Sequence, residues 1–407
     1  MCYNHFMNFI QNKIKEITDS RRPDYILLLL ASSLIIISIL FSYSLSIYTV
    51  VYFEYNQFHF FIRQFLVGSF AILIMWSLSH IKPEVIISKI GWFLFGAFLF
   101  IMVLMPFLPA FLVSEVGGAN RWIKLPGFSL SPVEFFKIGF IYFLANSFHR
   151  RLIAKSKISF VEELKLLVPY GIVFSFVVFL VAVMQKDLGQ VVVLGAIFIV
   201  LLVFANRSYK VFLSLFGIVI AGFILLIAIA PHRILRIQSW WSGVQDSMLA
   251  FMPDFIANTL RVKEFPEAYQ VGHSLNAIFH GGLNGVGIGD GSLKLGFLTE
   301  VHTDFVLGGM TEEIGVFGVG IIVMILFTII LRIFRISRKV EDIKHHLFTL
   351  GIGLMLIFAF LINSYGISGI IPIKGIAVPL LSYGGSSLLS SSIAIGLVLS
   401  ISKEIKD

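Results

Sequence analysis

The residue with the clearest potential for chemistry is a carboxylate at the start of a long apolar run. Asp304 follows Glu300 and His302 and directly precedes that run. Burial and neighbouring charges can raise the pKa of such a carboxylate until it serves as a general base. The alternative role is N-cap of the helix that follows. Glu300 and His302 could bind a metal ion with Asp304, but their spacing matches no known metal signature.

Cations in other segments could complement this carboxylate. Arg121 lies beside Trp122 after two glycines, and a guanidinium presented on a flexible turn can bind a phosphate through two hydrogen bonds. Trp122 alone is more typical of a residue that anchors a helix at the membrane surface. Lys294 follows the glycine-rich segment 281–289, and Lys374 lies between a proline and a glycine. We therefore expect an anion to bind near these cations.

A Ser-Pro-x-Glu pattern predicts where the helix that carries another cation begins. Ser131 at N-cap, Pro132 at N1 and Glu134 at N3 form a capping-box arrangement. Lys137 lies one turn further along, and the sequence leaves two roles open for it: a local ion pair with Glu134, or a cation that lines a cavity. Ser386 lies in a segment of serines and glycines, where close helix packing is the default interpretation.

Three further features predict structure rather than chemistry. Asp187 lies in a tight turn, where we expect it to cap the following helix. Glycines recur through 281–289, which predicts a backbone held close to another segment, and no strand precedes them as a dinucleotide-binding motif would require. Glu312 and Glu313 lie within an apolar run, so at least one must face protein or water.

The elements that must position these residues are membrane helices. Hydrophobic residues make up 57% of the 407 positions and charged residues 13%, about half the charge of a soluble domain. The apolar runs are continuous, unlike the alternating strands of a membrane barrel, and long enough to cross a bilayer as helices. This predicts an all-α, polytopic integral membrane protein of about ten transmembrane helices, at 25–45, 60–81, 90–112, 133–148, 166–184, 190–205, 211–230, 305–331, 347–365 and 377–401.

The charge distribution predicts the orientation of these helices. Twenty of the 31 Lys and Arg residues fall in segments assigned to the cytoplasm. The predicted parts are a cytoplasmic segment 1–24, a membrane domain 25–401 with a large extracytoplasmic loop 231–303 between the seventh and eighth helices, and a cytoplasmic tail 402–407. The net charge of +8 then reflects topology, and we expect no nucleic-acid partner. Cys2 is the only cysteine, so no disulfide forms within the chain.

Taken together, the motifs resemble the SEDS family of bacterial cell-wall polymerases, which includes FtsW, RodA and SpoVE. The resemblance covers nearly the whole chain and is strongest to the FtsW branch, because residues 372–375 resemble its Pro-Thr-Lys-Gly. The residues that carry it are 118–122, Pro132 with Glu134 and Lys137, Gln185 with 187–189, Glu300 with 302–305, Glu312 and Glu313 with Gly315, and 379–387.

The resemblance implies a glycosyltransferase that polymerises lipid II, a disaccharide-peptide on undecaprenyl diphosphate, into glycan strands during cell division. It implies Asp304 as the general base, inversion at the anomeric carbon and release of undecaprenyl diphosphate. A Mg or Mn ion is compatible with a diphosphate, but no cofactor is certain. The residues expected to bind substrate are Arg121, Trp122, Lys137, Lys294, Glu300, His302, Lys374 and Ser386.

The resemblance also implies where the protein works and with what. The expected location is the bacterial cytoplasmic membrane at the division septum, with both termini in the cytoplasm and lipids around the helices. The expected partners are a class B penicillin-binding transpeptidase and membrane proteins of the division complex. Three alternatives stay open: a lipid II flippase, a RodA-like polymerase of the lateral wall, and a scaffold without catalytic activity.

Overall fold

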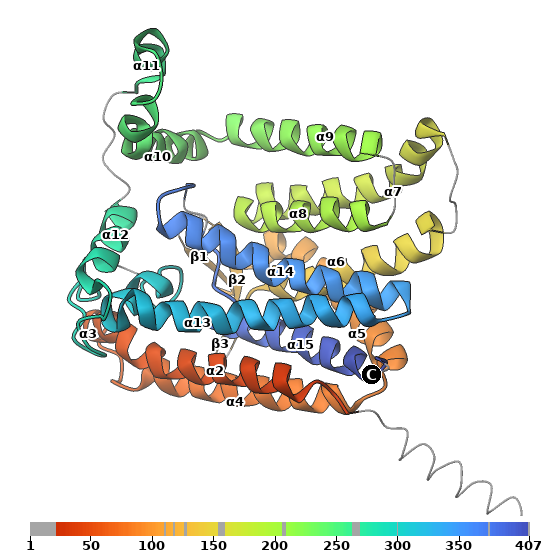
Figure 1. Ribbon diagram of the computed structural model, residues 1–407, viewed down its shortest axis with the longest axis horizontal. Helices are drawn as coiled ribbons and strands as arrows, with labels where there is room; N and C mark the ends of the chain where they lie inside the picture. The colour runs from red at the N-terminus through yellow and green to blue at the C-terminus, as the bar shows by residue number, and fades with distance from the viewer. Residues whose placement is uncertain are drawn as a thin grey trace, which may run out of the picture.

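The computed structural model describes residues 22–109, 111–116, 119–125, 128–153, 159–205, 209–262, 269–298, 300–372 and 375–405. Its helices lie largely side by side (Figure 1). The elements are α2 Tyr25–Leu45, α3 Ile47–Tyr52, α4 His59–His80, α5 Pro83–Leu104, η1 Met105–Phe107, β1 Val113–Val116, β2 Ala119–Leu125, β3 Phe128–Leu130, α6 Pro132–Ser147, η2 Phe148–Ile153, α7 Phe160–Val178, η3 Phe179–Met184, α8 Leu188–Phe204, α9 Tyr209–Ala228, α10 Pro231–Leu249, α11 Asp254–Leu260, α12 Tyr269–Gly281, α13 Val306–Lys339, α14 Ile343–Ile367 and α15 Gly385–Ser402.

The helices confirm the predicted fold class. Within the described residues, eight are long and apolar enough to cross a membrane: α2, α4, α5, α7, α9, α13, α14 and α15. The other two predicted spans are α6, with 16 residues, and the apolar helix α8, with 17. The chain is therefore a multi-pass, all-α membrane protein. Its large predicted loop contains three helices of its own, α10, α11 and α12.

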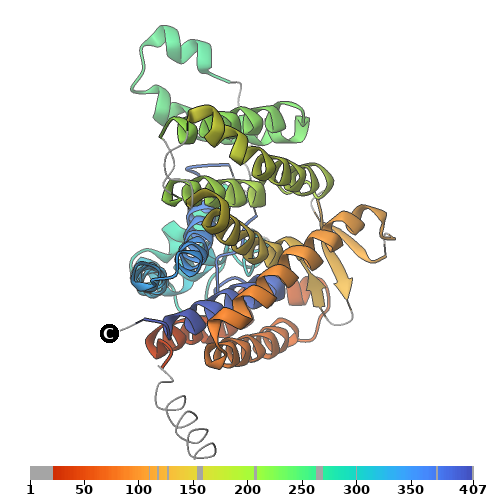
Figure 2. The same cartoon turned by 90° about the vertical axis from the view of Figure 1, so that its right-hand side faces the viewer.

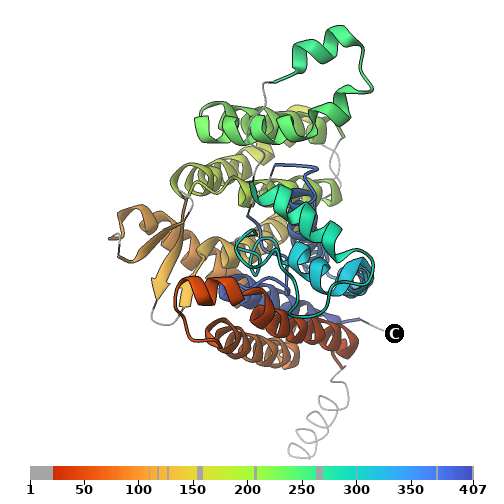
Figure 3. The ribbon, with the colours of Figure 1, turned by 90° about the vertical axis from the view of Figure 1, so that its left-hand side faces the viewer.

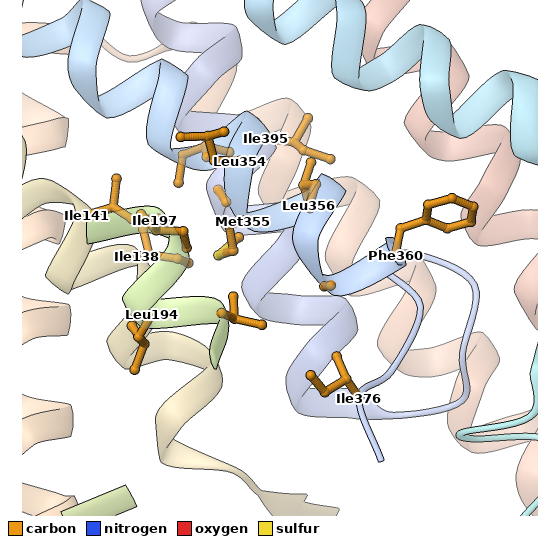
Figure 4. Close-up of a cluster of buried hydrophobic side chains, with 14 of the residues drawn as sticks. Ile138, Ile141, Leu194, Ile197, Leu354, Met355, Leu356, Phe360, Ile376 and Ile395 are labelled. Atoms are coloured by element: carbon orange, nitrogen blue, oxygen red, sulfur yellow. The ribbon is translucent and has the colours of Figure 1, made fainter. Parts of the chain in front are cut away.

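Close helix contacts build the centre of the bundle. A Cβ on Gly139 of α6 would lie 2.2 Å from the backbone nitrogen of Phe95 in α5, so only glycine lets these two helices approach so closely. Beside them, α6, α8, α14 and α15 bury an apolar core (Figure 4). Ile376, on the segment before α15, packs into this core and so connects it with one end of the bundle.

The two ends of the bundle collect different parts of the chain. At one end Asp24, just before α2, forms an ion pair with Arg332, and its backbone N–H donates to the hydroxyl of Ser402. These are segments predicted to lie in the cytoplasm. At the opposite end lie α3, α12 and the loops beside them (Figure 1), and Figure 3 faces that end. The structure thus keeps the predicted inner and outer segments apart.

Several sequence predictions about the elements were wrong in detail. The third span begins at Pro83 rather than residue 90, because proline at N1 starts the helix despite Lys89 within it. The last span begins at Gly385, not 377, because the proline at 379 and a left-handed Leu380 interrupt the helix. Residues 375–384 therefore form an irregular segment.

Another error concerns Arg121, which was expected on a flexible turn. It lies instead on β2 of a three-stranded antiparallel sheet in the order β1-β2-β3, seen beside the bundle in Figure 2. The Pro-Gly pair at 126–127, with Trp122 and Ile123 before it and Phe128 after it, was the signal for this hairpin.

The glycine-rich segment is held against α13, as the sequence predicted. The helix breaks at Gly315, whose φ is +70°, and this leaves carbonyls without helical partners. The N–H groups of Val286 and Gly287 donate to the carbonyls of Glu312 and Glu313, at 3.0 Å each. These hydrogen bonds satisfy polar backbone that would otherwise be costly within an apolar environment.

We expect Gly315→Ala to destabilise the protein. The added Cβ would require a left-handed φ, at a cost of about 1–2 kcal/mol, and would lie 2.3 Å from the carbonyl oxygen of Leu283. Gly320→Ala on the same helix is the matched control, because its Cβ meets no atom within 4 Å. The thermal unfolding midpoint in detergent should fall for Gly315→Ala alone. Equal midpoints for the two variants would contradict the broken helix.

Candidate functional site

Asp304 lies immediately before α13 and is fixed through its backbone. The N-cap of α13 is Phe305, with no side-chain capping bond, so the predicted alternative of Asp304 as a cap is wrong. The amide nitrogen of Asn363, on α14, donates to the carbonyl oxygen of Asp304 and to that of Ile376, at 2.7 Å each. One asparagine therefore ties Asp304 to the irregular segment 375–384.

An ion pair holds Arg121 next to this carboxylate. Nη1 of Arg121 lies 3.1 Å from Oδ2 of Asp187, and the guanidinium stacks on Trp122 at 4.6 Å from its ring centre. Asp187 also caps α8, as predicted, because its Oδ1 accepts the N–H of Gln190 at 3.3 Å. The start of α8 thus fixes the guanidinium.

Gly375 brings the two charged groups to one point. A Cβ on this residue would lie 3.0 Å from Oδ2 of Asp304 and 3.7 Å from Nη1 of Arg121. Its φ of +61° also favours glycine. A side chain at this position would therefore crowd the carboxylate of Asp304, while the guanidinium of Arg121 lies at ordinary contact distance.

The surroundings tune Asp304 toward proton transfer. Burial raises the pKa of Asp304 to about 6, while the positive charge of Arg121 lowers it and the carboxylates of Glu300 and Asp187 raise it. Burial also lowers the pKa of His302, against a smaller opposite effect of Glu300. At neutral pH Asp304 is thus largely ionised yet basic enough to accept a proton.

The structure places two predicted substrate ligands beside Asp304. His302 is buried, with its ring 4.9 Å from that of Phe60 and 5.4 Å from that of Tyr383. Glu300 is exposed, and its Oε2 accepts the hydroxyl of Thr303 at 2.9 Å. Their contact with substrate stays a prediction, while their proximity to Asp304 follows from the chain.

Lys137 combines both roles that the sequence left open. It pairs with Glu134 at 2.9 Å, and the two residues line a small cavity with Ser387 and Ser391 of α15. Glu134 also accepts the side-chain amide of Gln190 at 2.7 Å. Lys137 therefore reaches a cavity without an uncompensated charge.

The predicted capping box at the start of α6 is wrong. The side chain of Ser131 makes no capping hydrogen bond, and Glu134 is engaged elsewhere. Instead the N–H of Ser131 donates to the hydroxyl of Ser386 at 2.9 Å, and that hydroxyl donates to the carbonyl of Ser129 at 3.0 Å. Ser386 thus joins α15 to β3 and α6.

Lys294 is engaged in a structural ion pair. Its side chain is 1% exposed and pairs with Glu313, and both groups bond the hydroxyl of Ser44. Glu312 accepts the N–H groups of Ser292 and Leu293. Both glutamates are thus buried in protein, which confirms the prediction that at least one avoids lipid. Lys294 is not brought to Asp304 by these contacts, and Lys374 lies outside the described residues.

Sequence reasoning missed three parts of this site. Asn363 was not singled out, Gly375 was noted only as part of the segment 372–375 that resembles the FtsW branch, and Asp187 was expected only as a helix cap. Backbone strain marks the same region: three of the four described non-glycine residues with positive φ are Lys186, Glu300 and Leu380. Such strain often accompanies functional sites. No sequence pattern could have found the Asn363 contacts, which join residues far apart in the chain.

Polar atoms without partners also gather here. Within the described part of the chain, Nε of Arg121, Nδ1 of His302 and Oδ1 of Asn363 are buried and have no hydrogen-bond partner. Each unsatisfied group of this kind needs an explanation, and a bound ligand would satisfy these three. No three described His, Cys, Asp or Glu side chains cluster as metal ligands.

The fold and the site define a multi-pass membrane protein with an acid–base centre between helix ends. The family model for FtsW, RodA and SpoVE, described as "Cell cycle protein", matches residues 24–407. The chain belongs to this FtsW/RodA/SpoVE family.

Individual proteins agree with this assignment. The chain is 48% identical to a "Probable peptidoglycan glycosyltransferase FtsW" of Helicobacter pylori over 92% of this chain and 97% of that one. Two solved structures share the fold at 20% identity. One, described as "Structural coordination of polymerization and crosslinking by a peptidoglycan synthase complex", has a TM-score of 0.67 over 93% and 97% of the two chains. The other is RodA of Thermus thermophilus, with 0.63 over 95% and 98%.

We expect Lys294→Met to destabilise the protein by about 3–5 kcal/mol, because it leaves the carboxylate of Glu313 buried without a countercharge. Lys294→Met with Glu313→Gln should recover much of the loss. Exposed Lys339→Met is the control. Unfolding midpoints in detergent measure all three. An unchanged midpoint combined with lost activity would restore the substrate-binding role predicted from sequence.

Proposed function

We propose that this protein is a peptidoglycan glycosyltransferase that polymerises lipid II at the outer face of the bacterial cytoplasmic membrane during cell division. The observation that carries the proposal is the buried carboxylate of Asp304, with a pKa of about 6, beside the guanidinium of Arg121. The name of the Helicobacter relative supports both the reaction and the division role.

Asp304 acts as the general base of this reaction. A hydroxyl of the acceptor sugar attacks the anomeric carbon of the donor, and Asp304 takes the proton of that hydroxyl. A new bond forms between the acceptor oxygen and the anomeric carbon while the bond from that carbon to the diphosphate oxygen breaks. Undecaprenyl diphosphate departs with the bonding electrons, and Asp304 later releases its proton to water. A single base with no covalent intermediate gives inversion.

Arg121 stabilises the leaving group. The diphosphate gains negative charge as it departs, and fixed donors are more effective than donors that must reorient. Asp187 and the Trp122 ring fix the guanidinium, and its Nε has no partner within the described residues. Lys374 would add a second cation. A Mg or Mn ion would bind oxygens of the diphosphate.

The remaining substrate contacts follow from position. His302 and Glu300 adjoin Asp304 in the chain, Trp122 adjoins Arg121, and Lys137 faces the cavity next to segment 375–384. Ser386 shapes the site through its bonds to β3 and α6. Lys294 supports the site through Glu313 rather than through the substrate.

The proposed setting is the division septum, with both termini in the cytoplasm and with a class B penicillin-binding transpeptidase and division-complex membrane proteins as partners. The separation of the basic inner ends from the Asp304 end supports this orientation. The structurally similar synthase complex, which is described as coordinating polymerisation and crosslinking, supports the transpeptidase.

The structure removes the reason for considering a flippase. That reason depended on charges within the membrane as markers of a polar path. Lys137 is paired with Glu134 and Glu313 with Lys294, while Glu312 accepts bonds from a loop.

We expect Asp304→Asn to abolish polymerisation, because an amide cannot accept the proton; loss of a general base costs about 10²–10⁴-fold. The assay is glycan-strand formation from purified lipid II by the protein with its transpeptidase. Asp254→Asn, an exposed carboxylate on α11, is the control and should stay active. Normal strands from a folded Asp304→Asn variant would refute the assignment of the base.

A further inference from the structure

In the side-chain amide of Asn363, the nitrogen makes both of its hydrogen bonds and the oxygen makes none within the described residues. Its amide nitrogen donates to the carbonyls of Asp304 and Ile376. Because both of these partners are acceptors, the nitrogen must face them and the orientation of the amide is fixed. Oδ1 therefore points elsewhere. Asn363 is only 6% exposed, and its Oδ1 has no donor among the described residues.

Asn363 also lines a small pocket. Asp304, Gly366 and Gly375 line it as well, with Ile362, Ile367 and Ile376. The two glycines contribute no side chain, and the isoleucines keep one wall apolar. The pocket has room for a single polar group of a ligand rather than for a whole sugar.

The polar groups of the pocket select the kind of ligand group that can enter. Oδ1 of Asn363 is an acceptor, and the ionised carboxylate of Asp304 accepts hydrogen bonds only. Phosphate oxygens are also acceptors and carry negative charge, so they are disfavoured here. A neutral donor such as a hydroxyl satisfies the oxygen of Asn363, whose unmet hydrogen bond otherwise destabilises the buried amide.

We propose that this pocket is a subsite for the acceptor sugar, in which Oδ1 of Asn363 accepts a hydrogen bond from the hydroxyl adjacent to the one that Asp304 deprotonates. The inference rests on the proposed function. Adjacent ring carbons of a sugar present two donors side by side, which matches two neighbouring acceptors. The site is then divided: Asp304 and Asn363 hold the acceptor, and Arg121 holds the diphosphate of the donor.

The test combines changes in protein and substrate. The probe is lipid II whose terminal sugar lacks the hydroxyl next to the attacking one, compared with unmodified lipid II as acceptor. Removing that hydroxyl should lower the polymerisation rate of the wild type at least about tenfold, since a buried acceptor is then left unpaired. In Asn363→Leu both acceptors should react at the same reduced rate. Asn146→Leu, at an equally buried asparagine of α6, should keep the full penalty.

A purely structural role for Asn363 predicts a different pattern. The Asn363→Leu variant would then polymerise both acceptors more slowly by the same factor, and the acceptor without the hydroxyl would still react more slowly than unmodified lipid II. This result would overturn the subsite. A wild type indifferent to the missing hydroxyl would overturn it as well. If the wild type makes no strands from unmodified lipid II, the proposed function itself fails.

Binding provides a second measurement if Asn363→Leu is too slow to assay. The affinities of the two acceptors are measured for two proteins: Asp304→Asn, and Asp304→Asn combined with Asn363→Ser. Serine is used at position 363 because it is smaller than leucine and is tolerated where leucine does not fit. The subsite predicts weaker binding of the altered acceptor, by at least about tenfold, in the first protein and no difference in the second. A difference that persists in the second protein would overturn it.

Discussion

The ion pair between Arg121 and Asp187 sets the condition on which the proposed chemistry depends. A guanidinium in direct contact with Asp304 would lower the pKa of that carboxylate by about 1–3 units and make it a poor base. Asp187 instead takes the direct contact, at 3.1 Å, and Arg121 acts on Asp304 through space. Burial then prevails, and the pKa of Asp304 stays at about 6.

This arrangement needs elements that are far apart in the chain to meet at one end of the bundle. Arg121 comes from a sheet strand, Asp187 from the start of α8, and Asp304 from the segment before α13. Gly375 and Asn363 join them, one through its missing side chain and the other through two hydrogen bonds. The apolar core below, which includes Ile376, holds these ends in place (Figure 4).

The same problem, polar groups in an apolar setting, is solved by pairing throughout the molecule. The carbonyls freed at Gly315 accept N–H groups of the glycine-rich segment. Lys294 neutralises Glu313, and Glu134 neutralises Lys137. Near Asp304, Arg121, His302 and Asn363 each keep a buried atom that has no hydrogen-bond partner among the described residues.

The sequence predicted the parts of this structure that depend on composition and local pattern. Long apolar runs determine membrane helices regardless of their neighbours, so α2 and α6 were placed within a residue or two. The capping role of Asp187 and the close approach of the glycine-rich segment 281–289 to another segment were also predicted from local patterns. The role of Lys294 could not be predicted, because its partner Glu313 lies on another element. The same holds for Asn363.

The most direct test of the account is the pH dependence of lipid II polymerisation. The base must be ionised, so the wild-type rate should fall about tenfold per pH unit below pH 6 and level off above it. Arg121→Gln removes the charge that lowers the pKa of Asp304, so its acidic limb should move to higher pH, while Arg121→Lys should move less. A rate independent of pH between 5 and 7, or a limb unmoved by Arg121→Gln, would contradict the account.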